Sequence, residues 1–259
     1  MVLKYLIFIC LLICCSSEFS PELARIVEGE VLGIEKVPWQ VSLLYKGTHY
    51  CGGVIYDNEI ILTAAHCVVG YSTSKLTVRA GSTISTCGGQ LVSVAKILLH
   101  EDYSDSRHSN DIAVILLTDR LSFNNAVQAI ELARRSPAHG GMAFVSGWGA
   151  LDECREQFSD HLRGTQLKIV GREQCASEQY GYGEMAAIDT ICTYAPGKDA
   201  GGGDSGGPLV YKNELVGLVS WGIGCGQNDY PGIFADVAYH REWILNAIRR
   251  VRNLKINQI

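Results

Sequence analysis

The sequence predicts an all-β protein, a barrel or a sandwich, that ends in a single α-helix. From Trp39 onward, short runs rich in β-branched residues follow one another, separated by Gly, Asn, Asp and Ser, which favour turns. Many short strands at such spacing are typical of barrels and sandwiches. From Val237 to Ile256 the pattern changes, and apolar residues recur at the spacing of one helix face.

The first predicted strand covers residues 40–45, where apolar Val41, Leu43 and Tyr45 occupy alternate positions. Further apolar runs predict strands at residues 54–56, 60–62, 76–78, 91–99, 112–117, 143–145, 167–170 and 209–219. The last element is a surface helix, whose basic last turns suit the negative end of a helix dipole. Its apolar face is formed by Trp243, Ile244, Ala247, Ile248 and Val251.

The N-terminus has the pattern of a secretory signal peptide over residues 1–17. Basic Lys4 precedes an apolar run from Tyr5 to Cys15, and the small residues Ser16 and Ser17 follow it. The run is shorter than the roughly 20 residues that a membrane-spanning helix needs, which disfavours a membrane anchor. We therefore expect a secreted, extracellular protein that does not associate with a membrane.

Composition and charge exclude several classes of protein. The 259 residues include 22 Lys and Arg against 27 Asp and Glu, a formal net charge of −5. A general nucleic-acid binder needs a basic surface, so no nucleic-acid partner is expected. Apolar residues make up 47% of the chain, which argues against disorder. The length allows one large domain or two small ones.

Ten cysteines suggest either metal binding or an oxidising compartment. Three of them lie in the signal peptide and leave with it. The remaining number is odd, so intramolecular disulfides do not pair them all. These cysteines contain no C-x-x-C pair, which weakens a zinc interpretation. They are Cys51, Cys67, Cys87, Cys154, Cys175, Cys192 and Cys225.

Three segments carry residues suited to nucleophilic catalysis. His66 lies in the run Leu-Thr-Ala-Ala-His-Cys, and Asp111 leads an apolar strand. Ser205 lies in the run Gly-Asp-Ser-Gly-Gly-Pro, where neighbouring glycines favour a tight turn with accessible backbone N–H groups. Each segment alone is moderate evidence. Together, in the order His, Asp, Ser, they are strong evidence for nucleophilic catalysis.

These motifs resemble those of trypsin-like serine proteases of the chymotrypsin family, and insect trypsins in particular. The matching runs are Ile26-Val-x-Gly29, Thr63 to Cys67, Asp111 to Ala113, Ser146-Gly-Trp-Gly149, Gly203 to Pro208, Ser220-Trp-Gly222 and Cys192 to Asp199. The resemblance implies two packed six-stranded antiparallel β-barrels followed by the C-terminal α-helix. It divides the chain into a signal peptide (1–17), an activation propeptide (18–25) and a protease domain (26–259), with barrels over roughly 26–135 and 136–235.

The resemblance also implies the mechanism of a serine endopeptidase. Ser205 would be the nucleophile, His66 its general base, and Asp111 the group that orients the imidazole and stabilises its charged form. A serine hydroxyl is a weak nucleophile near neutral pH and needs such a base. The backbone N–H groups of Gly203 and Ser205 would form the oxyanion hole.

The substrate pocket follows from the same resemblance. Asp199 stands six positions before Ser205, where the family places the floor of its primary pocket. A carboxylate there would pair with a substrate Arg or Lys. Ser220 and Trp221 would lie on the strand that binds substrate backbone, and Gly222 and Gly232 would form the open pocket wall.

The resemblance further implies that the protein is made as a zymogen. Cleavage after Arg25 would free an ammonium group on Ile26, which would pair with the buried carboxylate of Asp204. This ion pair would order the pocket and the oxyanion hole.

The cysteines both match the family and depart from it. Two family disulfides are expected, Cys51–Cys67 and Cys175–Cys192. A third family disulfide is absent on both sides, at Ala143 and Tyr211, and a fourth is broken on one side, because Gly201 stands where relatives usually have a cysteine and its expected partner Cys225 remains. We expect a softer pocket with a higher KM or slower turnover. We also hypothesise a replacement bridge between Cys154 and Cys225, which leaves Cys87 as the odd cysteine; non-reducing peptide mapping would test the bridge.

The sequence predicts no metal or other cofactor. The region 81–89, where relatives bind calcium, contains no Asp or Glu. Pro231 stands where a sodium-binding relative would have Tyr.

The expected partners are protein or peptide substrates and protein protease inhibitors, and the expected state is a monomer. The alternative is a weak or inactive homologue that binds protein partners; Gly201 favours it, and the intact triad favours an enzyme.

Overall fold

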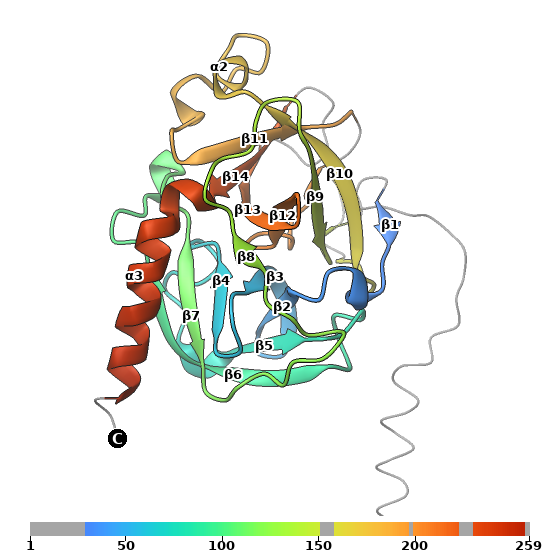
Figure 1. Cartoon of the computed structure of the whole chain (residues 1–259), viewed down its shortest axis with the longest axis vertical. Helices are drawn as coiled ribbons and strands as arrows, with labels where there is room; N and C mark the ends of the chain where they lie inside the picture. The colour runs from blue at the N-terminus through green and yellow to red at the C-terminus, as the bar shows by residue number, and fades with distance from the viewer. Residues whose placement is uncertain (1–28, 151–157, 197–198, 223–229, 257–259) are drawn as a thin grey trace, which may run out of the picture.

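The computed structural model describes residues 29–150, 158–196, 199–222 and 230–256. Two antiparallel β-barrels pack against each other, and one long helix lies along their side (Figure 1). Each barrel closes through a ring of six strands. The predicted class of two six-stranded barrels with a C-terminal helix is therefore confirmed.

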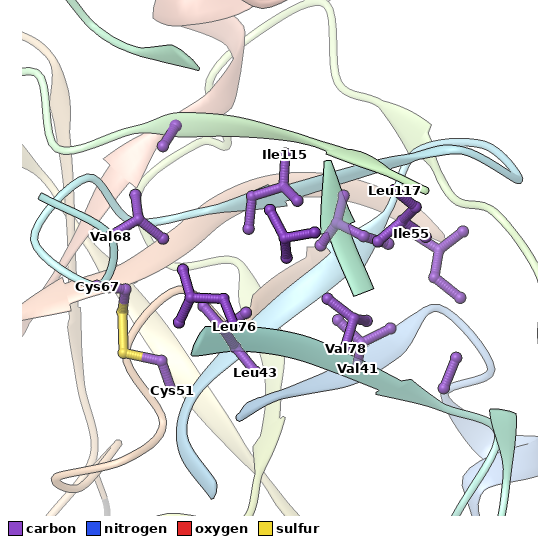
Figure 2. Packing of buried hydrophobic residues seen from close by; sticks show 14 of the residues in the cluster. Val41, Leu43, Cys51, Ile55, Cys67, Val68, Leu76, Val78, Ile115 and Leu117 are labelled. Atoms are coloured by element: carbon purple, nitrogen blue, oxygen red, sulfur yellow. A yellow bond between two sulfur atoms is a disulfide. The ribbon is translucent and has the colours of Figure 1, made fainter. Parts of the chain in front are cut away.

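The first barrel is a closed ring of six strands, in which the last neighbour pairs again with the first. Its interior is apolar and includes Val41 and Leu43 from the first predicted strand (Figure 2). Around the ring the strands are β2 (Gln40–Tyr45), β3 (Thr48–Ile55), β4 (Ile60–Thr63), β7 (Ala113–Leu117), β6 (Gln90–Leu99) and β5 (Leu76–Ala80).

One polar residue of β2, Gln40, joins the two barrels. Gln40 and Ser42 alternate with the core residues, yet both are fully buried. The Gln40 Oε1 accepts a hydrogen bond of 2.7 Å from the Ser146 hydroxyl of the second barrel. Burial of such groups is tolerated because they are hydrogen-bonded. The alternation that predicted β2 thus separates a core face from a face toward the second barrel.

The second barrel closes through the pairing of β9 with β10. Two further short strands extend its sheet: β1 (Glu30–Val31) pairs with β10, and β8 (Glu131–Leu132) pairs in parallel with β13. Both strands precede residue 135, the predicted boundary between the two barrels. The sheet of the second barrel therefore includes residues from before that boundary. The ring is β9 (Met142–Gly147), β10 (Arg163–Val170), β11 (Thr190–Tyr194), β14 (Gly232–Asp236), β13 (Glu214–Trp221) and β12 (Pro208–Tyr211).

The run at residues 209–219, expected as one strand, forms the hairpin of β12 and β13. Its two turn residues, Lys212 and Asn213, have φ angles of 51° and 63°. Positive φ at both central residues is typical of a type I′ turn, which matches the twist of paired strands.

The helix α3 (Val237–Ile256) has the bounds that the apolar pattern predicts. Asp236 caps its start, since its Oδ1 accepts hydrogen bonds from the N–H groups of Ala238 and Tyr239. Ile244 and Ile248 pack into an apolar cluster with residues of both barrels. No helix in the described part of the chain has the length and apolar character to cross a membrane. The described residues also form α2 (Arg172–Cys175) and the short 3-10 helices η1 (Ile34–Lys36), η2 (Thr73–Lys75), η3 (Asp105–Arg107) and η4 (Gly183–Met185).

Candidate active site

Strand pairing in the first barrel brings His66 and Asp111 together. His66 follows the end of β4 and Asp111 precedes the start of β7, and these strands pair so that Thr63 faces Ala113. The Asp111 Oδ2 lies 2.7 Å from the His66 Nδ1, and the Asp111 Oδ1 accepts a 2.9 Å hydrogen bond from the His66 backbone N–H. The carboxylate thereby fixes both the ring and the main chain of the histidine.

Electrostatics favour a charged carboxylate beside this imidazole. Burial alone would raise the pKa of Asp111, but hydrogen bonds and charge from His66, with a hydrogen bond from Ser220, lower it overall. Burial would lower the pKa of His66, but Asp111 outweighs it and raises that pKa. The Ser220 hydroxyl donates to the Asp111 Oδ2 at 2.5 Å. The pair is therefore arranged to stabilise a proton on His66.

The disulfide between Cys67 of the histidine loop and Cys51 of β3 lies beside the serine turn. The Cys67 Sγ lies 3.7 Å from the His66 Nε2 and 3.5 Å from the carbonyl oxygen of Ser205. The same carbonyl accepts a 2.7 Å hydrogen bond from the N–H of Gly52 in β3. Ser205, on the second barrel, and His66, on the first, therefore lie at one junction. Cys51 pairs with Cys67, as predicted, at the edge of the first core (Figure 2).

Glycines shape the turn that carries Ser205. Gly203 has a φ of 91° and Gly206 a φ of 77°, both in the region that favours glycine. A Cβ on Gly206 would lie 2.1 Å from the Thr63 Oγ1, and one on Gly203 would lie 2.8 Å from the ring of Phe158. The glycines around Ser205 thus let the turn pass close to β4, which holds the serine near the histidine loop.

Asp204 is a buried acid directly before the serine. It accepts hydrogen bonds from the N–H groups of Gly149 and Gly201 at 2.7 and 2.8 Å. A Cβ on Gly147 or Gly149 would lie 2.0 or 2.3 Å from its carboxylate, so these glycines make room for it. Burial raises the pKa of Asp204 to about 6 despite the two hydrogen bonds. Its predicted partner, Ile26, and the cleavage residue Arg25 lie outside the described residues.

A cavity of about 220 Å³ contains all the predicted pocket residues. Ser205 lies on its wall together with Asp199, whose carboxylate accepts a 2.8 Å hydrogen bond from the Ala200 N–H. A Cβ on Gly232 would lie 2.4 Å from the Asp199 Oδ1, so a glycine is needed there. The cavity is lined by Asp199, Ala200, Gly201, Gly202, Ser205, Val219, Ser220, Trp221, Gly222, Gly232, Ile233 and Phe234.

The carboxylate of Asp199 lacks a counter-charge within the described part of the chain. Burial raises its pKa to about 7, the Ala200 N–H opposes the shift, and the nearby Asp204 adds to it. A second cavity, beside the first, contains His66 and Asp111 and shares Ser220 and Trp221 with it. The arrangement can hold a cationic side chain next to a serine and a histidine–carboxylate pair.

Two supporting residues were not found from the sequence. The Ser220 hydroxyl, assigned to a strand that binds substrate, also binds Asp111. His49 is buried, lies edge-on to Phe158, whose ring is next to Gly203, and has its Nδ1 2.8 Å from the Ser42 hydroxyl. Burial lowers the pKa of His49 to about 4. A lone histidine in a strand carries no sequence signal for this position.

The second predicted disulfide, Cys175–Cys192, is also present. Cys154 and Cys225 lie outside the described residues. At Gly201 a Cβ would lie 2.9 Å from the carbonyl oxygen of Ala150, so the two backbones approach closely. A cysteine in this position would therefore require the neighbouring chain to move.

The two barrels and the residues at their junction define a serine endopeptidase, and comparisons with known proteins give the same class. The trypsin family model matches residues 26–244, and the chain belongs to the trypsin family. It is 45% identical to trypsin alpha-4 of Lucilia cuprina and 44% identical to trypsin alpha of Drosophila melanogaster, over 96% of this chain and 100% of each relative. Among solved structures, neuropsin, a serine protease expressed in mouse brain, matches with a TM-score of 0.78 at 31% identity over 85% of this chain and 99% of its own.

Proposed function

We propose that this serine endopeptidase hydrolyses peptide bonds after Arg or Lys. The observation that carries the proposal is the buried carboxylate of Asp199, on the wall of the cavity that also contains Ser205. A substrate cation would supply the missing counter-charge, whereas an apolar side chain would leave the carboxylate buried and unpaired. The cleaved bond would then lie beside the serine.

In the proposed mechanism, the Ser205 hydroxyl attacks the scissile carbonyl carbon while the His66 Nε2 takes its proton. Asp111 holds the Nδ1–H and stabilises the imidazolium that forms. The backbone N–H groups of Gly203 and Ser205 stabilise the oxyanion of the tetrahedral intermediate. His66 then returns the proton to the leaving amine, and a water molecule, activated in the same way, hydrolyses the acyl-enzyme.

We further propose secretion and synthesis as a zymogen, with residues 1–17 as signal peptide and 18–25 as activation propeptide. Support comes from Asp204, whose fully buried carboxylate has a raised pKa. A buried carboxylate is stabilised by a cation, and the ammonium group of Ile26, freed by cleavage after Arg25, would provide one. Protein protease inhibitors would occupy the same cavity, and the enzyme would act as a monomer.

The test is to cleave the purified proenzyme after Arg25 and assay it on peptide amides with Arg, Lys or Phe before the scissile bond. We expect turnover of the Arg and Lys amides only after cleavage, together with labelling of Ser205 by an organophosphonate. Cleavage after Phe but not Arg would refute the role of Asp199. If none of the three amides is cleaved and Ser205 does not react with the organophosphonate, the result would favour a homologue that only binds protein partners.

A further inference from the structure

A buried acid outside the triad holds the chain segment that leads into Asp111. Asp189 precedes β11 of the second barrel and is 5% exposed. Its Oδ2 accepts a hydrogen bond of 2.6 Å from the backbone N–H of Asn110. Asn110 lies directly before Asp111 on the first barrel, so this bond connects the two barrels at the proposed catalytic acid.

Asn110 is in a conformation that needs support. Its φ angle is 53°, in the left-handed region, which asparagine tolerates better than most residues but still at some cost. Its side-chain Nδ2 donates to the carbonyl oxygen of Asp102 at 3.1 Å, and its own carbonyl accepts from the N–H of Ile112 at 2.9 Å. The Asp189 bond holds its remaining backbone group, the N–H.

Asp189 is itself held in place. Its backbone carbonyl accepts a 2.8 Å hydrogen bond from the N–H of Asp236 in β14. The buried ring of His240, in the first turn of α3, places its Nε2 3.6 Å from the Asp189 Oδ2. Figure 1 shows α3 running beside β7, the strand that follows Asp111. Burial would raise the pKa of Asp189, but the nearby His240 ring and the hydrogen bond from the Asn110 N–H lower it overall.

We propose that Asp189 is a positioning residue of the protease: its carboxylate fixes the Asn110 peptide and thereby the direction in which Asp111 faces His66. This inference rests on the proposed role of Asp111 as the acid of the triad. Asp189 contacts neither the cavity that contains Ser205 nor the one that contains His66. Its loss should therefore lower kcat and leave KM nearly unchanged, because a misplaced catalytic group slows chemistry without altering the pocket.

Two substitutions of similar size separate positioning from packing. Asp189→Leu fills the site but cannot accept the Asn110 N–H, whereas Asp189→Asn keeps an acceptor oxygen. We expect kcat on an Arg amide to fall about 10- to 100-fold in Asp189→Leu and to stay within about threefold of wild type in Asp189→Asn. Enzyme concentrations are fixed by organophosphonate titration of Ser205. If Asp189→Leu does not fold, Asp189→Ala replaces it.

Asp57→Leu is the matched control, because the Asp57 carboxylate also accepts backbone N–H groups, those of Glu59 and Ile60, but belongs to the first barrel and lines neither cavity. It should lower the melting temperature and leave kcat near wild type. The proposal would be overturned by a wild-type kcat in Asp189→Leu or by equal losses of kcat in the Leu and Asn variants. It would also be overturned if the control and Asp189→Leu, at equal melting temperatures, lost kcat equally.

The pKa of His66, measured by NMR, gives a readout that does not require turnover. Because Asp111 raises this pKa, a misdirected Asp111 should lower it in Asp189→Leu but not in Asp189→Asn. An inactive wild-type protein would contradict the proposed function, but the His66 pKa could still be compared between wild type and the two variants. An unchanged His66 pKa in Asp189→Leu would contradict the positioning role alone.

Discussion

Two buried carboxylates on either side of Ser205 have opposite electrostatic environments. Asp111 and Asp199 are almost equally hidden, 5% and 7% exposed. Asp111 accepts hydrogen bonds from the ring and main chain of His66 and from Ser220, and its pKa is lowered. Asp199 accepts one from the Ala200 N–H, and burial raises its pKa to about 7. Since burial is nearly equal, the partners decide the direction of each shift.

The difference separates two tasks. Asp111 has its partners in the resting protein, so its charge is ready before any substrate binds, as preorganised electrostatic catalysis requires. Asp199 lacks a cation among the described residues, so its buried charge is costly until a substrate brings one. The first carboxylate would act on rate and the second on the choice of substrate.

The largest effect is expected from Asp111→Asn. The amide keeps the shape but not the charge, and it cannot stabilise a proton on His66. We expect kcat on an Arg amide to fall about 100- to 10,000-fold with KM changed little, as for loss of a positioned general base. Steady-state kinetics on titrated enzyme measure this, and a loss confined to KM would mean that Asp111 serves binding instead.

A somewhat smaller and more selective effect is expected from Asp199→Asn. Without the carboxylate, a substrate cation would be buried unpaired, which costs several kcal/mol. We expect kcat/KM for Arg amides to fall roughly 30-fold to several thousand-fold. The same variant should cleave a Phe amide no more slowly than wild type does. Parallel losses on both substrates would show that the substitution damaged the triad and not the pocket floor.

The raised pKa of Asp199 predicts how substrate preference depends on pH. Below about pH 7 the carboxyl group is increasingly protonated and neutral, so it attracts a substrate cation less. The ratio of kcat/KM for Arg over Phe amides should therefore fall with pH, about tenfold per unit well below the pKa. Titration of His66 affects both substrates and cancels in the ratio. A ratio that is flat in wild type, or that varies equally in Asp199→Asn, would contradict this assignment.

The fold could be predicted from sequence where the local pattern is strong. Strand β2 and helix α3 have the predicted bounds, because each has one clear apolar periodicity. Strands β11 and β14 were missed, although both are paired on two sides in the second barrel. They are five residues long, and β14 contains Gly232 and Asp236, residues depleted in strands. Their neighbours in the barrel, and not their own sequence, decide their conformation.

The candidate site shows the same limit. The motifs predicted which residues gather at the barrel junction, because glycine-rich turns and the residues around them are distinctive in sequence. They could not show that the Ser220 hydroxyl contacts Asp111 or that the Asp189 carboxylate contacts the Asn110 N–H, because those contacts join segments 109 and 79 residues apart. A serine in a strand or an acid in a loop has no spacing to a partner that identifies its role.

The smallest effect is expected from Ser220→Ala. Its hydroxyl donates to Asp111 at 2.5 Å and helps to lower the pKa of that acid. A hydrogen bond to a charged group contributes about 1.5–3 kcal/mol, so kcat should fall about 10- to 100-fold at the most, with Asp111 still held by His66. Ser136→Ala is the matched control, since that hydroxyl also donates at 2.5 Å to a buried carboxylate, that of Asp236. If both variants lose stability but only Ser220→Ala loses kcat, the hydroxyl acts on the charge of Asp111; equal kinetics in the two would make it a packing contact.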